Sequence, residues 1–299
     1  MSDDFFDFFE KVQEKKEIRT WDAVIGNPPY QDAVKKNGQR GARTHVWNKF
    51  VKCSFEITGK DGIVALIHPS GWRRGNGKFS EIGDYIRSKK ILYLELHNID
   101  DGNKTFGVTV GYDWYVAKNC ENESVTDVMD CEGKKHKIDL RQFIAIPDSH
   151  LDEILSLMAK KGEKKVEFIH SCSAYEHRKS HVQKEKDKDH KFPVVYSLPK
   201  SGKQIWWSST KDNGHFGISK VIWSNGAGSQ ILIDEEGKYG MTEWAYAIAD
   251  KTENLPKIKE AMESDKFLKI CKYIQFSLDK YDPKFIQLFR KDFWKKFIS

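Results

Sequence analysis

The stretch Asp22-Ala23-Val24-Ile25-Gly26-Asn27-Pro28-Pro29-Tyr30 decides how the fold of this 299-residue chain is interpreted. It begins as a short apolar run and ends abruptly in a proline-rich loop, a pattern typical of a strand that stops at a turn. Both prolines fix φ and lack a backbone donor, and Pro28 also restrains Asn27 towards an extended geometry. The sequence therefore predicts a short buried strand through Val24 and Ile25, followed by a rigid loop.

This loop offers hydrogen-bond acceptors beside an aromatic ring. The carbonyls of Asn27 and Pro28 have few internal donors, and the Asn27 side chain adds another acceptor oxygen. Two acceptors bound to the N–H groups of an exocyclic amine would free its lone pair, while Tyr30 would hold the heterocycle by stacking. The pattern points to a nucleobase amine. The alternative is an ordinary turn, because Asn-Pro commonly initiates turns, but Pro-Pro and an aromatic after Gly-Asn favour the functional interpretation.

Outward from the loop, apolar periodicity alternates between helices and strands. The expected elements are a helix at 5–16, the strand through Val24 and Ile25, a polar loop at 31–44, a helix at 45–57, a strand at 62–67, a helix at 81–88, a strand at 91–96 and two strands between 106 and 116. This order favours an α/β fold whose sheet ends in an antiparallel edge hairpin.

The composition changes after about residue 119, and we expect three regions. Residues 1–119 form the domain that carries the loop, residues 120–165 are connecting elements, and residues 166–299 are a second, α+β domain. A charged strand pair at 121–141 and a helix at 151–161 are expected in between. The charged run at 177–191 is interpreted as a solvated loop.

Charge and cysteine content narrow the class of protein. Lys and Arg number 50 against 44 Asp and Glu, and this net charge of +6 permits nucleic-acid binding without requiring it. The five cysteines are widely spaced and contain no Cys-x-x-Cys pair, which indicates reduced thiols. No apolar run approaches the roughly 20 residues of a membrane span, and the acidic start lacks the basic flank of a signal peptide. We expect a soluble, cytoplasmic protein that binds no membrane.

The stretch from Asp22 to Tyr30 resembles motif IV of the adenine-N6 DNA methyltransferases of the restriction–modification type. Residues 62–73 and 106–115 are similar to the segments that follow motif IV in this family, and residues 220–226 with 239–242 resemble part of its target-recognition region. The resemblance implies a partial Rossmann-like methyltransferase sheet followed by a target-recognition domain that binds double-stranded DNA. The catalytic residues it implies are Asn27, Pro28, Pro29 and Tyr30, with Phe106 against the flipped adenine, where core packing is the alternative.

The methyl donor of this family is S-adenosylmethionine, held on a glycine-rich loop that lies well before motif IV. Only 26 residues precede Asn27, whereas each missing strand–helix unit needs about 30 residues. A downstream candidate at Ser224–Ser229 matches poorly, because an apolar run typical of a strand follows it. We therefore expect a split enzyme in which a second subunit binds most of the donor. The alternatives are a non-catalytic nucleic-acid-binding or regulatory protein and a subunit of an RNA adenine methyltransferase.

Basic residues outside the loop are further candidates. Arg73, Arg74 and Lys78 flank glycines after an expected strand, where phosphate contacts and ordinary surface charge are equally favoured. Lys220 lies in the expected recognition region and is a candidate for nucleic-acid binding. His170, Cys172 and their neighbouring histidines lack zinc-finger spacing, so no metal site is expected.

Overall fold

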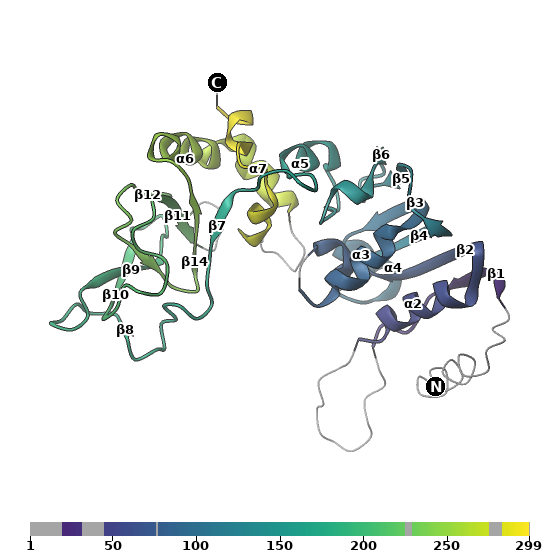
Figure 1. Ribbon diagram of the computed structural model, residues 1–299, viewed down its shortest axis with the longest axis horizontal. Helices are drawn as coiled ribbons and strands as arrows, with labels where there is room; N and C mark the ends of the chain where they lie inside the picture. The colour runs from purple at the N-terminus through teal and green to yellow at the C-terminus, as the bar shows by residue number, and fades with distance from the viewer. Residues whose placement is uncertain (1–19, 32–44, 76, 225–228, 275–282, 299) are drawn as a thin grey trace, which may run out of the picture. The chain divides into compact units, whose positions relative to one another are not determined.

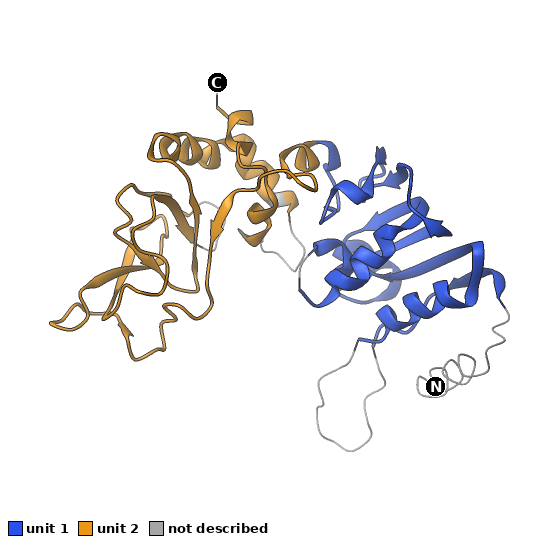
Figure 2. Ribbon diagram, viewed as in Figure 1, with its two compact units in different colours: residues 1–152 blue, residues 153–299 orange. Residues whose placement is uncertain are grey.

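The computed structural model describes residues 20–31, 45–75, 77–224, 229–274 and 283–298. The chain forms two compact units, residues 1–152 and residues 153–299 (Figure 1 and Figure 2). The expected helix at 5–16, nearly all of the expected loop at 31–44 and the glycine-rich part of 224–229 lie outside the described residues. Among the described helices, none is long and apolar enough to cross a membrane.

Unit 1 is built on one six-stranded sheet with the order β1-β2-β4-β3-β5-β6 (Figure 1). Its strands are β1 (Trp21–Gly26), β2 (Thr58–Pro69), β3 (Lys89–His97), β4 (Tyr112–Glu121), β5 (Thr126–Met129) and β6 (Lys135–Ile138). The pairs β1–β2 and β3–β5 are parallel, while β4 is antiparallel to both β2 and β3, and β6 is antiparallel to β5. The expected α/β class is confirmed. The antiparallel hairpin at the end of the sheet is β5 with β6, the strand pair expected at 121–141, and not the hairpin expected at 106–116.

Two helices pack on this sheet close to where the sequence predicts them. The helix α2 (Trp47–Ile57) packs on β2 and α3 (Ser80–Ser88) packs on β3. Trp47, Val51 and Phe55 lie four residues apart on one face of α2 and are all buried, as a 3.6-residue period requires. The predictions at 45–57 and 81–88 are confirmed to within two residues.

The expected pair of strands between 106 and 116 is wrong. A third helix, α4 (Ile99–Phe106), precedes a single strand, β4, which inserts between β2 and β3. A capping box starts this helix: the Asn98 side chain accepts from the Asp101 amide at 3.0 Å, and Asp101 accepts from the Asn98 amide at 3.1 Å. Gly107, with φ +66°, ends it in the left-handed conformation. The capping box and Gly107 therefore favour a helix at 99–106, although the β-branched residues that follow favour a strand.

The strand β1 is not buried as expected. The Ile25 side chain is 80% exposed and Trp21 is 50% exposed, although β1 is paired in parallel with β2. In the described part of the chain β1 lies at the edge of the sheet and has a strand neighbour on one side only. Apolar character therefore marks a surface here rather than a core position.

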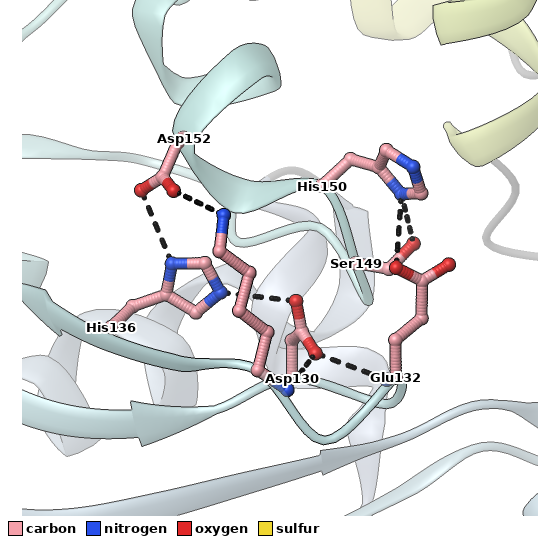
Figure 3. A network of polar contacts seen from close by, with 7 residues as sticks. Asp130, Glu132, His136, Ser149, His150 and Asp152 are labelled. Atoms are coloured by element: carbon pink, nitrogen blue, oxygen red, sulfur yellow. Dashed lines mark hydrogen bonds and ion pairs between the residues drawn. The ribbon is translucent and has the colours of Figure 1, made fainter.

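Residues 120–152 extend unit 1 and do not form a linker, because β5 and β6 continue its sheet. Within this hairpin, the imidazole of His136 in β6 joins Asp130 and Asp152 (Figure 3). Its Nε2 lies 3.0 Å from Asp130 Oδ2 and its Nδ1 lies 3.1 Å from Asp152 Oδ1. The last residue of unit 1 is thereby fixed to the hairpin.

Unit 2 contains two four-stranded sheets, with the orders β13-β9-β10-β8 and β12-β11-β14-β7. Its elements are α5 (Leu151–Leu157), which begins at the unit boundary, β7 (Glu167–Ile169), β8 (Val182–Gln183), β9 (Phe192–Ser197), β10 (Gln204–Ser208), β11 (Lys220–Ser224), β12 (Leu232–Asp234), β13 (Gly240–Met241), β14 (Ala245–Ala249), α6 (Leu255–Glu263) and α7 (Asp265–Tyr273). Val195, Ile222 and Ala247 form part of a core between the two sheets. The predicted α+β character of this region is confirmed.

Candidate functional site

The loop Asn27–Tyr30 lies at the edge where the parallel strands of unit 1 end. Gly26, the last residue of β1, pairs with Leu66, three residues before the end of β2. Pro69 at the end of β2 and His97 at the end of β3 both pair with Tyr112, the first residue of β4. Ligand sites of open α/β sheets lie outside the carboxyl ends of the strands, so the loop occupies the expected position for a site.

Within the loop, side chains alternate between solvent and interior. Asn27 and Pro29 are exposed, Pro28 is buried, and Tyr30 is half-buried. The Tyr30 carbonyl accepts a hydrogen bond from the Val46 amide at 3.4 Å, which ties the loop to the start of α2. The exposed Asn27 side chain and the partly open Tyr30 ring are accessible to a ligand at this edge.

The Tyr30 hydroxyl is buried and has no hydrogen-bond partner among the described residues. Burial raises the pKa of Tyr30, and the nearby Tyr112 and Asp113 raise it further. The hydroxyl is therefore neutral at physiological pH. Asp113 Oδ1 is likewise buried without a partner among those residues, so two buried polar atoms at this edge are unsatisfied.

Tyr112 connects the loop to Phe106. The Phe106 ring meets the Tyr112 ring edge-on with 4.9 Å between centroids, and His97 stacks on Tyr112 at 4.3 Å. The Thr105 hydroxyl lies 3.3 Å from the Tyr112 hydroxyl. Phe106 remains 38% exposed. The structure thus places Phe106 at the same edge as Tyr30, with Tyr112 beside both, and a role against a base stays a prediction.

Arg73 neither contacts phosphate nor forms part of the surface charge, the two alternatives considered for it, because its side chain is fully buried. Its Nε donates to Asp113 Oδ2 at 2.8 Å, its Nη1 donates to the Ile146 carbonyl at 2.8 Å, and Nη2 pairs with Asp148. Burial opposes the charge, but Asp113 and Asp148 together raise the pKa of Arg73. Burial also raises the pKa of Asp113 to about 6, against the opposing effect of Arg73. This is a structural ion pair beneath the site.

Lys220 is also buried, so the prediction of a nucleic-acid contact there is wrong. Its Nζ donates to Asp234 Oδ2 at 2.6 Å and to the Ile218 carbonyl at 3.1 Å. Burial lowers the pKa of Lys220, although Asp234 acts in the opposite direction. Arg74 and Lys78 are exposed as expected, and their contact with phosphate stays a prediction.

Sequence reasoning missed His68, which lies completely buried at the end of β2. Its ring stacks on Trp47 with 4.6 Å between centroids, and its Nε2 lies 3.3 Å from the Tyr115 hydroxyl. Burial lowers the pKa of His68 to about 4, while the Pro69 carbonyl acts weakly in the opposite direction. A neutral imidazole is therefore packed against Trp47 at the carboxyl end of β2.

The neutral His68 predicts acid sensitivity of unit 1. In the unfolded chain its pKa is about 6.5, so only the unfolded state takes up the proton as the pH falls from about 6.5 to 4. About 3 kcal/mol of unfolding free energy is therefore lost across that window. Urea unfolding of wild type and His68→Gln at several pH values tests this. The difference between the two proteins should shrink as the pH falls, and a constant difference would contradict the assignment.

The described residues do not fit a donor-binding loop for S-adenosylmethionine. The strand β2 leads into α3 through a segment that contains Gly71, Gly75 and Gly77, but this segment forms the short 3-10 helices Ser70–Arg74 and Gly77–Phe79 instead of one tight turn. Only Asn98 separates β3 from α4. Around the candidate at Ser224–Ser229, β11 and β12 are antiparallel strands, so no helix follows the turn. Nor do three metal-ligating side chains come together in the described part of the chain.

A family model matches the first third of the chain. Residues 2–106 match the model of a family described as Eco57I restriction-modification methylase, and this range includes Asn27–Tyr30 and Phe106. The resemblance to restriction–modification methylases is thereby confirmed at family level. No curated protein matches the chain.

Among solved structures, several restriction–modification proteins are similar to this chain. The type IIL enzyme MmeI in complex with DNA is 9% identical at a TM-score of 0.46, covering 89% of this chain and 45% of MmeI. The type IIG restriction endonuclease BpuSI is 8% identical at a TM-score of 0.35, covering 84% and 42%. A type I methyltransferase subunit from Streptococcus thermophilus is 16% identical at a TM-score of 0.28, covering 47% and 32%. The chain spans less than half the length of each.

Proposed function

Because residues 2–106 match the Eco57I restriction-modification methylase family, we propose that this protein supplies the acceptor site and the recognition unit of an S-adenosylmethionine-dependent DNA adenine-N6 methyltransferase. The observation that carries the proposal is the position of Asn27–Tyr30 at the carboxyl edge of the sheet, beside Tyr112 and near Phe106. The coenzyme would supply an electrophilic methyl group.

The residues of this chain would hold the acceptor base. The Asn27 side chain and the Pro28 carbonyl accept the N–H groups of the adenine amine and so localise its lone pair on nitrogen. Tyr30 stacks on one face of the extruded base, and Phe106 contacts it from the rim. Catalysis on this side is positioning combined with hydrogen bonding to the amine, and no acid or base of this chain is required to ionise.

We assign the donor site to a second polypeptide that docks along β1. Two observations support this assignment: the described residues lack a donor loop, and β1 presents Ile25 and Trp21 at an open sheet edge. A strand edge with exposed apolar side chains favours pairing with another strand. The occupant is therefore a unit that adds a strand to β1 and places the methyl donor next to Asn27.

Replacing Ile25 by lysine should weaken this assembly without unfolding unit 1, because the side chain is already 80% exposed. Burying a lysine in an apolar contact costs several kcal/mol. We therefore expect the rate of methyl transfer to fall at least tenfold when the concentration of the partner subunit is limiting. The matched control is Val125→Lys, since Val125 is 53% exposed just before β5 in the same sheet. The test uses co-purified proteins and a tritiated methyl donor. Equal activity of the two variants, or tight donor binding by this chain alone, would contradict the split arrangement.

A non-catalytic nucleic-acid-binding protein is the second candidate, favoured by the same lack of a donor loop in the described residues. The two functions differ in one assay. A methyltransferase labels DNA at adenine-N6 when partner and donor are present, whereas a scaffold binds DNA and transfers nothing. Parallel assays with RNA and DNA oligonucleotides separate the two acceptor classes.

A further inference from the structure

The net positive charge of this protein lies entirely in unit 2. Residues 153–299 carry 27 Lys and Arg against 20 Asp and Glu, a net charge of +7, whereas residues 1–152 carry 23 against 24, a net charge of −1. A local basic excess attracts nucleic acid through its phosphates. Because Lys220 is buried, the contact must be made elsewhere on this unit.

A cavity of about 530 Å³ opens on unit 2 between the segment that follows β7 and the residues around the start of β14. Its lining includes Trp244, Arg178, His170, Tyr246 and Glu243. This volume lies within the usual range of small-molecule sites, about 300–1,000 Å³, and can admit one nucleotide. Every lining residue belongs to unit 2, so the cavity is complete within that unit.

The cavity combines an exposed aromatic side chain with an exposed cation. Trp244 is 44% exposed, which is unusual for a large apolar side chain in this unit. The Arg178 side chain is 77% exposed and its Nε donates to Glu176 Oε1 at 2.6 Å. An exposed indole suits stacking of a base, and an exposed guanidinium suits a phosphate.

The remaining polar groups of the cavity are held in fixed positions. Glu243 accepts from the His177 amide at 3.2 Å and pairs with the His177 imidazole. His170 stacks on Tyr246 at 4.6 Å, and its Nδ1 lies 3.3 Å from the Ala245 carbonyl. Burial lowers the pKa of His170, so its ring is neutral and flat against Tyr246. The walls are thus preorganised, while Trp244 and Arg178 face solvent.

We propose that this cavity is a nucleic-acid contact site in which Trp244 stacks on a base and Arg178 binds the adjacent phosphate. The inference rests on the proposed function, because it assigns residues of unit 2 that contact the nucleic-acid substrate. Glu176 competes with the phosphate for Arg178 and so limits the affinity of the site.

Fluorescence anisotropy of the full chain with labelled single-stranded and duplex oligodeoxynucleotides tests this site. Trp244→Ala should weaken single-strand binding about tenfold, and Trp244→Phe should retain most of the affinity. Arg178→Ala should reduce the slope of log affinity against log salt by about 0.7 to 0.9, the amount expected for one lost phosphate contact. Glu176→Gln should strengthen binding.

The chain provides a matched control for the arginine. Lys238 pairs with Glu236 two residues earlier, as Arg178 does with Glu176, and it is exposed on the same unit but outside the cavity. Lys238→Ala removes the same charge and should leave the salt slope nearly unchanged. Equal slopes for the two variants, or unaltered single-strand affinity in Trp244→Ala, would overturn the proposal.

The outcome for the cavity is separable from the outcome for methyl transfer. These binding assays need neither partner nor methyl donor. If methyl transfer is never detected but Trp244→Ala loses affinity, the proposed enzyme activity fails and the contact site stands. If the variants bind like wild type while methyl transfer proceeds, the contact site fails and the activity stands. Absence of any DNA binding by the wild-type chain overturns the contact site.

Discussion

Replacing Asn27 by alanine should lower the rate of methyl transfer about 100- to 1,000-fold, comparable with the loss of one preorganised polar contact to a reacting group in other enzymes. The side chain is exposed at the carboxyl edge of the sheet, so its removal leaves no cavity and no unsatisfied buried partner. DNA affinity should stay close to that of wild type, because the basic excess lies in unit 2. Single-turnover kinetics with saturating donor and partner measure the effect.

A comparison at Tyr30 sharpens this prediction. Tyr30→Phe keeps the ring and removes a hydroxyl that has no partner among the described residues, so it should retain most of the activity. Tyr30→Ala removes the stacking surface and should lose activity together with affinity for the target base. If Asn27→Ala methylates DNA at the wild-type rate, the loop does not hold the acceptor amine.

Replacing Asp113 by alanine should destabilise unit 1 by about 3–5 kcal/mol, the usual cost of removing one partner of a buried ion pair, although Asp148 still pairs with Arg73. Asp113 accepts from both Arg73 and Trp72 at 2.8 Å, and the Arg73 side chain has no exposed surface. The free energy of unfolding from urea titration at neutral pH measures this loss. Asp127→Ala breaks an exposed pair with Lys137 and should change stability little.

The double variant Arg73→Met with Asp113→Leu tests whether the loss of stability in Asp113→Ala comes from the unbalanced buried charge or from lost packing contacts. Replacing a whole buried ion pair by apolar residues of similar size costs far less than removing one partner. The double variant should therefore be more stable than Asp113→Ala. If it is less stable, the loss arises from the Trp72 and Ile146 contacts rather than from the unbalanced charge.

The order of helices and strands in unit 1 could be predicted, because apolar spacing in α2, α3, β2 and β3 follows the periods of helix and strand. The helix α4 was missed although its signal was present. Asn98 followed three residues later by Asp101, with Gly107 at the far end, is a capping pattern that the β-branched residues after it obscured.

Burial of charged residues could not be predicted from local sequence. Arg73 looks like surface charge because its partners Asp113 and Asp148 lie 40 and 75 residues further along the chain. Burial of Lys220 was missed for the same reason, because only the pairing of β11 with β12 brings Asp234 next to it. The prediction for Ile25 was wrong in the opposite direction, since an apolar residue expected in the core is exposed. Whether an apolar strand is buried depends on which elements lie beside it. Trp244 gave no signal, since exposure of a single aromatic has no sequence pattern.

The open edge of β1 also bears on how the protein behaves in solution. Among the described residues β1 has a strand neighbour on one side only and exposes the Ile25 side chain, and such an edge strand is a template for any extended chain, including another copy of itself. Purified alone at high concentration, the protein should form soluble aggregates whose size grows with time. Co-expression with the cognate donor subunit should keep it monodisperse, so light scattering would identify that subunit before any methyl group is transferred.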